Sequence, residues 1–102
     1  MAVKKLNPAQ FGADVEASHG LVLVDFYAVW CGPCKMLSPV TEEFSEKHPE
    51  VPVYKVDIDE AGELTVRFGI SAVPTLILFK EGKPFKKSVG LVDLGEIEAM
   101  LG

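Results

Sequence analysis

Two cysteines separated by two residues are the side chains of this sequence with the most evident chemistry. Cys31 and Cys34 enclose Gly32 and Pro33, and the chain has no other cysteine. A thiolate is the attacking species in thiol–disulfide exchange, and this spacing lets the second sulfur attack a mixed disulfide formed on the first. The pattern therefore predicts a reversible dithiol–disulfide couple, with Cys31 as the nucleophile and Cys34 as the resolving thiol.

The elements around the pair support this chemistry. An apolar run over residues 21–27, rich in β-branched and aromatic side chains, predicts a strand buried on both faces, and a helical pattern begins near Pro33. Unpaired N–H groups and partial positive charge at a helix start stabilise a thiolate, so the pKa of Cys31 should fall. We expect Cys31 to be exposed and Cys34, which borders an apolar stripe through Leu37, to be buried.

Three other uses of the cysteine pair compete with redox chemistry. Zinc or iron–sulfur ligation needs further ligands, yet His19 and His48 lie too far apart for the usual half-site. A purely structural disulfide would close a very short loop and stabilise the fold by roughly 2 kcal/mol before strain. Two inert core cysteines would sit poorly beside Gly-Pro at a helix start. Redox chemistry is the favoured interpretation.

The rest of the pattern predicts an α/β fold. The predicted helices span residues 8–18, 33–47, 60–68 and a last segment after Asp93, and the predicted strands span residues 3–5, 21–27, 51–58, 75–79 and 85–89. Strands that alternate with helices imply a partly parallel central sheet, which the closing hairpin makes mixed. Asn7 and Asp93 are expected N-caps. The inward stripe of the second helix should comprise Met36, Leu37, Val40 and Phe44, with a kink at Pro39.

Length and composition limit the possible functions. A chain of 102 residues suits one domain over residues 1–102, and we expect it to be a monomer. The net charge of -5 argues against nucleic acid or an anionic membrane as partner, and the lysines at 80, 83, 86 and 87 are best explained as a solvated hairpin. No apolar run can span a bilayer, and the first residues lack the apolar core of a secretory signal, so we expect a cytoplasmic protein.

The residues around the cysteines resemble the thioredoxin family. The resemblance is carried by residues 24–35, which include Trp30-Cys31-Gly32-Pro33-Cys34, and by Val73-Pro74-Thr75 and Val89-Gly90. It extends over essentially the whole chain and implies the thioredoxin fold, a mixed central β-sheet flanked by helices on both faces. It also implies an enzyme that reduces disulfides of client proteins, binds no cofactor of its own, and is re-reduced by a flavin- and pyridine-nucleotide-dependent thioredoxin reductase. Gly-Pro between the cysteines is similar to the reducing members.

Asp25 and Lys55 are candidates for handling protons. From the sequence, a solvent-facing or bulge position for Asp25 competes with a functional one in the apolar strand. Burial without a partner would raise the pKa of its carboxyl, which suits proton relay near neutrality. The resemblance implies that Asp25 lies beneath the disulfide and takes the proton of the resolving thiol. Lys55 would by default be a surface lysine, and the resemblance makes it a modulator of Asp25.

An apolar patch around the cysteines should receive extended or unfolded client chains. Its expected members are Trp30, Gly32, Pro33, Val73, Pro74, Gly90 and Leu91. A trans proline at a strand start is the ordinary interpretation of Pro74, whereas the resemblance implies a cis bond packed against the cysteines. The Val73 backbone would then pair with an extended substrate segment. Trp30 could instead belong to the core, and Gly90 to a strand-end bulge.

Two positions depart from the commonest family pattern. Tyr27 stands where many thioredoxins have Trp, and Val29 stands where a polar residue or Pro is common. Neither change removes a chemical group that the mechanism needs. Two rival functions stay open at this point: a redox-independent interaction subunit with the same fold, and a net oxidase working in an oxidising compartment.

Overall fold

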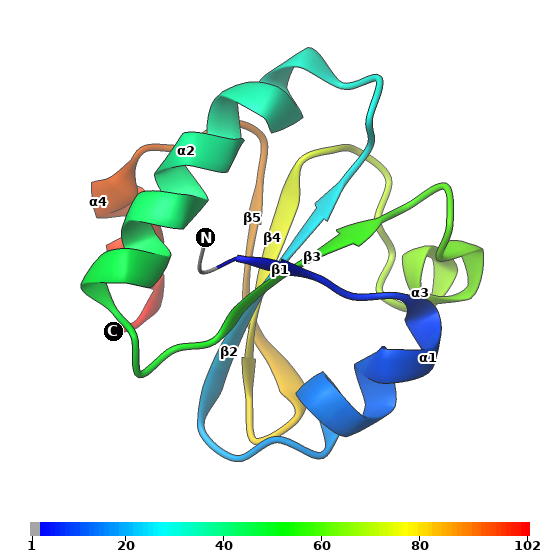
Figure 1. Cartoon of the computed structure of the whole chain (residues 1–102), viewed down its shortest axis with the longest axis horizontal. Coiled ribbons are helices and arrows are strands. Elements are labelled where there is room, and N and C mark those ends of the chain that lie inside the picture. The colour runs from blue at the N-terminus through cyan, green and yellow to red at the C-terminus, as the bar shows by residue number, and fades with distance from the viewer. Residues whose placement is uncertain (1–2) are drawn as a thin grey trace.

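Residues 3–102, the part of the chain that the computed structural model describes, form a five-stranded mixed sheet. Its strands are β1 (Lys4–Lys5), β2 (Leu21–Tyr27), β3 (Val53–Asp57), β4 (Thr75–Lys80) and β5 (Lys83–Val89). The strand order is β1-β3-β2-β4-β5 (Figure 1). The pairs β1–β3 and β3–β2 are parallel, while β2–β4 and β4–β5 are antiparallel. The predicted mixed sheet is confirmed.

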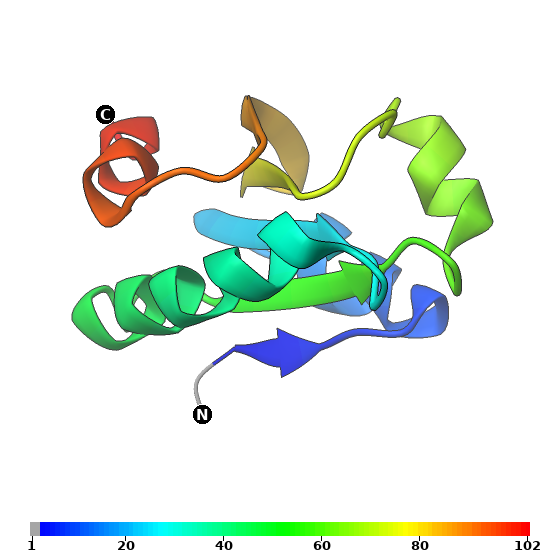
Figure 2. The same ribbon diagram turned by 90° about the horizontal axis from the view of Figure 1, so that it is seen from above.

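Helices cover both faces of this sheet. They are α1 (Pro8–Phe11), the π-helical η1 (Gly12–Glu16), α2 (Gly32–Lys47), α3 (Gly62–Arg67) and α4 (Leu94–Met100). Figure 1 shows α2 and α4 on one side of the sheet and α1 and α3 on the other, and Figure 2 shows the same separation from above. None of these helices, within residues 3–102, has the length and apolar character needed to cross a bilayer.

Each face of the sheet has its own apolar core. Phe11, Leu64 and Phe79 belong to the core under α1 and α3, and Leu37 and Ile97 belong to the core under α2 and α4. Successive side chains of a strand point to opposite faces, so the apolar run of β2 supplies both cores at once. This explains why its sequence is continuously apolar rather than alternating.

Local hydrogen bonds fix the helix ends as predicted. The side chain of Asn7 accepts the N–H of Gln10, whose own side chain accepts the N–H of Asn7, which completes a capping box. The Asp93 carboxylate accepts the N–H of Glu96 at 2.8 Å at the start of α4.

Two sequence predictions about the helices are wrong. The first helix is not α-helical throughout, because Ala17 donates its N–H to Gly12, five residues back, and η1 is therefore a π-turn. Met36 is 61% exposed and does not belong to the inward stripe of α2. Successive helix residues are rotated by roughly 100°, and the stripe centred on Leu37 and Phe44 leaves Met36 facing solvent. Helix α2 runs through Pro39 without interruption, and the kink expected there stays a prediction.

Candidate active site

The cysteine pair lies where β2 has ended and α2 begins. Cys31 is the N-cap of α2, with extended backbone at φ -94° and ψ 115°, and its Sγ accepts the N–H of Cys34 at 3.1 Å. Pro33 occupies the first turn, where its missing N–H leaves no gap in the hydrogen bonding. Cys31 and Cys34 form a disulfide, with their Cα atoms 5.3 Å apart. The helix start thus directs an N–H donor and the positive end of the helix dipole at the Cys31 sulfur.

Both cysteines are buried in this disulfide form. Each is only 5% exposed, so the expectation that Cys31 would be exposed is wrong. The Cys31 sulfur is bonded to that of Cys34, and the carbonyl oxygen of Val73 lies 3.7 Å from it. Ala28 completes the small cluster around the two sulfurs. Access to Cys31 is therefore narrow and is bounded by the Val73 backbone.

Asp25 is a buried carboxyl beside this cluster. It is 4% exposed, and within residues 3–102 its Oδ1 has no hydrogen-bond partner. Burial raises the pKa of Asp25 from 3.8 to about 7, and the nearby positive charge of Lys55 opposes that rise. The solvent-facing alternative from the sequence is thereby excluded. Asp25, Lys55 and Cys34 line one pocket of about 240 Å³, together with Tyr27, Ala28, Val29, Lys35 and Ser38.

Lys55 reaches this pocket from the neighbouring strand. It is the register partner of Asp25 in the parallel pairing of β2 with β3. The side chain is half-buried, and its Nζ lies 5.5 Å from the centroid of the Tyr27 ring. The default interpretation as a plain surface lysine therefore does not hold.

The expected patch residues surround the cysteines at different depths. The Val73–Pro74 bond is cis, as the resemblance implied, and the Pro74 carbonyl accepts the N–H of Gly90 at 2.8 Å. Pro74 itself is buried, so it supports the surface rather than forming it. Trp30 is 67% exposed, which excludes the core alternative, and Leu91 is 45% exposed. Gly32 and Pro33 are also exposed.

A second hollow, of about 280 Å³, runs between Trp30 and Val73. Its other lining residues, which sequence reasoning missed, are Ile58, Ile70, Ser71 and Ala72. Their only sequence signal is position, because residues 70–72 directly precede Val73 and Ile58 follows β3. The carboxyl ends of parallel strands meet at one edge of a sheet, so residues after β3 lie near those after β2.

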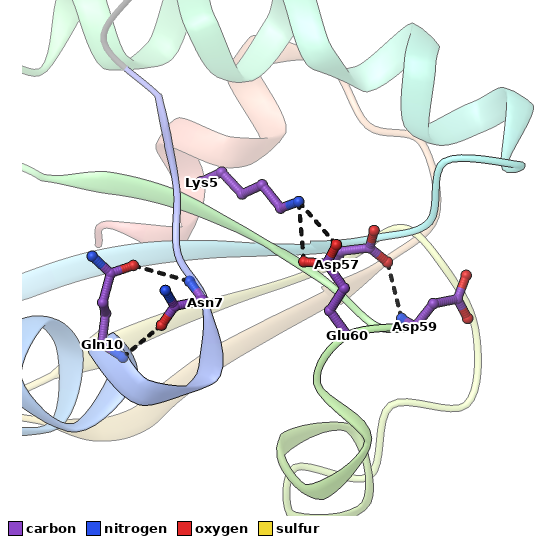
Figure 3. Close-up of polar contacts among 6 residues, drawn as sticks. All are labelled: Lys5, Asn7, Gln10, Asp57, Asp59 and Glu60. Atoms are coloured by element: carbon purple, nitrogen blue, oxygen red, sulfur yellow. Dashed lines mark hydrogen bonds and ion pairs between the residues drawn. The ribbon is translucent and has the colours of Figure 1, made fainter.

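Asp59 is another residue that the sequence did not single out. Its carboxylate accepts the indole N–H of Trp30 at 2.9 Å. Its own N–H donates to Asp57 Oδ1 at 2.9 Å, which closes the turn after β3 (Figure 3). The turn therefore holds the exposed indole in one orientation at the rim of the site. No group of three or more His, Cys, Asp or Glu residues that could hold a metal ion occurs in the described chain.

Comparison with known proteins agrees with this geometry. Residues 2–102 match the family described as Thioredoxin. The thioredoxin of Alicyclobacillus acidocaldarius subsp. acidocaldarius is 53% identical over 101 residues, which cover 98% of this chain and 95% of that protein. The thioredoxin of Chlamydia muridarum is 57% identical over 81 residues, which cover 79% of this chain and 78% of that protein.

A further relative carries the match inside a longer protein. The bifunctional thioredoxin reductase/thioredoxin of Mycobacterium leprae is 47% identical over 87 residues, which cover 84% of this chain and 19% of that protein. In this chain a disulfide at a helix start lies on a mixed sheet with helices on both faces. The chain accordingly belongs to the thioredoxin family, and it is a thiol–disulfide oxidoreductase with the thioredoxin fold.

Proposed function

We propose that Cys31 attacks disulfides of client proteins and that Cys34 resolves the mixed disulfide so formed. The observation that carries this assignment is the position of Cys31 as N-cap of α2, where its sulfur accepts the N–H of Cys34. Negative charge on that sulfur is stabilised by the hydrogen bond and by the helix dipole. The Cys34 sulfur lies one turn into the helix and lacks this placement.

The reaction consists of two exchanges. The Cys31 thiolate bonds to one sulfur of the client disulfide, and the client S–S bond breaks to release the other sulfur as a thiolate. The Cys34 thiolate then bonds to the Cys31 sulfur and displaces the remaining client thiolate. Two electrons have passed to the client, and the protein holds the Cys31–Cys34 disulfide seen in the structure.

Asp25 takes the proton of Cys34 in the second exchange. Both residues line the same pocket, which has room for water to carry the proton between them. Because burial raises the pKa of Asp25 to about 7, the carboxyl can accept and return a proton near neutrality. The charge of Lys55 keeps the carboxylate form accessible.

An extended client segment docks in the hollow beside Trp30. The Val73 backbone borders the Cys31 sulfur and offers its polar groups for strand-like pairing. Trp30, Gly32, Pro33, Gly90 and Leu91 form the surrounding surface, and Pro74 supports it from below.

The oxidised protein is returned to the dithiol by a flavin-dependent thioredoxin reductase. The name of the Mycobacterium leprae relative joins a thioredoxin reductase to a thioredoxin, which supports a reductase as the natural partner. In this proposal the chain works as a cytoplasmic monomer, as a single domain over residues 1–102, and without a cofactor of its own.

Trapping of the mixed disulfide tests the assignment of the cysteines. The Cys34→Ser variant should accumulate client adducts through Cys31, visible on a non-reducing gel and removed by dithiothreitol, because the resolving sulfur is absent. The matched Cys31→Ser variant should give few or no adducts. Equal trapping by both variants, or by neither when both are folded, would reject the roles given to the two sulfurs.

A further inference from the structure

Lys55 has an aromatic partner rather than an acidic one. Its Nζ lies 5.5 Å from the centroid of the Tyr27 ring, within the distance of roughly 6 Å at which a ring face attracts a cation. Among the described residues, Lys55 forms no ion pair. The position of this ammonium is therefore set by the ring and by the longer-range field of the pocket.

Two acidic residues near this row of the sheet other than Asp25, namely Glu60 and Asp57, have hydrogen-bond partners of their own. Lys5 is the register partner of Lys55 on β1, and both oxygens of Glu60 bind its Nζ, at 3.0 and 3.2 Å (Figure 3). Asp57 accepts the N–H of Asp59. Two lysines side by side repel each other, and the bond to Glu60 gives Lys5 an acidic partner that Lys55 lacks among the described residues. Lys55 lines the pocket.

The strand register brings three groups together on that side. Asp25 is opposite Lys55, and Tyr27 follows Asp25 by two residues on the same face of β2. All three line the pocket that also contains Cys34. The Tyr27 ring can hold the Lys55 ammonium near the Asp25 carboxyl. Because the ring carries no net charge, it does not neutralise the ammonium.

We propose that Tyr27 is a positioning residue, whose ring holds the Lys55 ammonium in the pocket where it acts on the Asp25 carboxyl. For catalysis this rests on the proposed role of Asp25 as proton acceptor for Cys34. The ionisable groups that face Asp25 are Tyr27 on β2, Lys55 on β3, and Cys34 and Lys35 on α2, while its β4 partner is the apolar Leu76.

The test measures the pKa of Asp25 by NMR titration of its carboxyl carbon. The oxidised protein is used because neither cysteine titrates in the disulfide. Tyr27→Leu should raise this pKa by about half a pH unit, since the held cation that favours the carboxylate is lost. Tyr27→Phe keeps the ring face and should leave the pKa near its wild-type value.

The same substitution in a Lys55→Gln background separates positioning from a general effect of the ring. There, Tyr27→Leu should change the pKa of Asp25 little, because no ammonium is left to position. An equal rise in both backgrounds, or no rise in either, would overturn the proposal. The trapping experiment with Cys34→Ser does not depend on Tyr27, so the two proposals can fail separately.

A measurement on the wild-type protein keeps the proposal testable if Tyr27→Leu does not fold. The ε-methylene protons of Lys55 should resonate upfield of those of the other lysines, because the ring current of Tyr27 shields a group above its face. Tyr27→Phe should preserve this displacement. Ordinary lysine shifts in the wild-type protein would reject the contact and the proposal with it.

Discussion

At the scale of one residue, Asp25 places a carboxyl at a buried position where an apolar side chain would stabilise the fold more. A carboxyl that is 4% exposed and has an unpaired Oδ1 loses its hydration when charged. Lys55 offsets only part of that loss, which is why the pKa of Asp25 stands at about 7 rather than near 3.8. The same burial that lowers the stability of the charged form gives the site a carboxyl that titrates near neutrality.

The pH dependence of stability should reveal this residue. Because folding raises the pKa of Asp25, the folded protein binds this proton more tightly than the unfolded chain. This tighter proton binding stabilises the folded protein fully below about pH 4. The stabilisation is lost as pH rises from about 4 to about 7, and it stays absent above pH 7. A difference of about 3 pH units corresponds to on the order of 4 kcal/mol.

Asp25→Asn should therefore be more stable than wild type at about pH 8.5, by up to this amount, and similar to wild type near pH 4. Urea unfolding of the two oxidised proteins across this range measures the difference. Asp93→Asn, which removes one carboxylate at an exposed position, serves as the control for the loss of a charge. A difference between wild type and Asp25→Asn that is constant with pH would contradict the buried, titrating carboxyl.

At the scale of the element, the β4–β5 hairpin depends on one close contact. Gly82 has φ +78°, a left-handed conformation that favours glycine, and a Cβ at this position would overlap the carbonyl oxygen of Glu16. The hairpin turn is therefore packed against the end of η1. Gly69, which ends α3, has φ +65° but no atom within 4 Å of an added Cβ.

The two glycines form a matched pair for testing that contact. Gly69→Ala should lower the free energy of unfolding by about 1 kcal/mol, the effect of the left-handed backbone alone. Gly82→Ala should lower it by about 3 kcal/mol, because the overlap with Glu16 adds to the same backbone effect. Denaturant titration measures both values. Equal losses in the free energy of unfolding for the two variants would show that the hairpin turn can move away from η1 at little cost in free energy.

The whole molecule is two cores that share one sheet. Val24 and Phe26 on β2 belong to the core under α1 and α3, whereas Leu23 on the same strand belongs to the core under α2 and α4. Because β2 contributes side chains to both cores, the loss of β2 from one core would disrupt the other core as well. This sharing supports the proposal that the chain folds as a single domain.

A single cooperative transition is the expected consequence. Unfolding followed by Trp30 fluorescence, which reports on the active-site end, should coincide with unfolding followed by far-UV circular dichroism. The disulfide must be kept in one state throughout, since a change in its oxidation during the titration would break two-state behaviour. Two separate midpoints would show that the faces unfold independently.

Much of the architecture could be predicted because its signals are local. The apolar run of β2, the caps at Asn7 and Asp93, and the turn between β4 and β5 each depend on residues within a few positions of one another. The placement of Cys31 at a helix start likewise needs only the Gly-Pro that follows it and the strand before it. The sequence by itself therefore determined the element order, the mixed sheet and the location of the redox pair.

Only the tertiary structure decided how deeply and beside which partners these residues lie. Cys31 is buried because the distant Val73 backbone approaches it, and Trp30 is held by Asp59 from the turn after β3. The meeting of Asp25 with Lys55 follows from the register of β2 against β3. Such contacts join residues far apart in the chain, and periodicity along one segment carries no information about how strands align with each other.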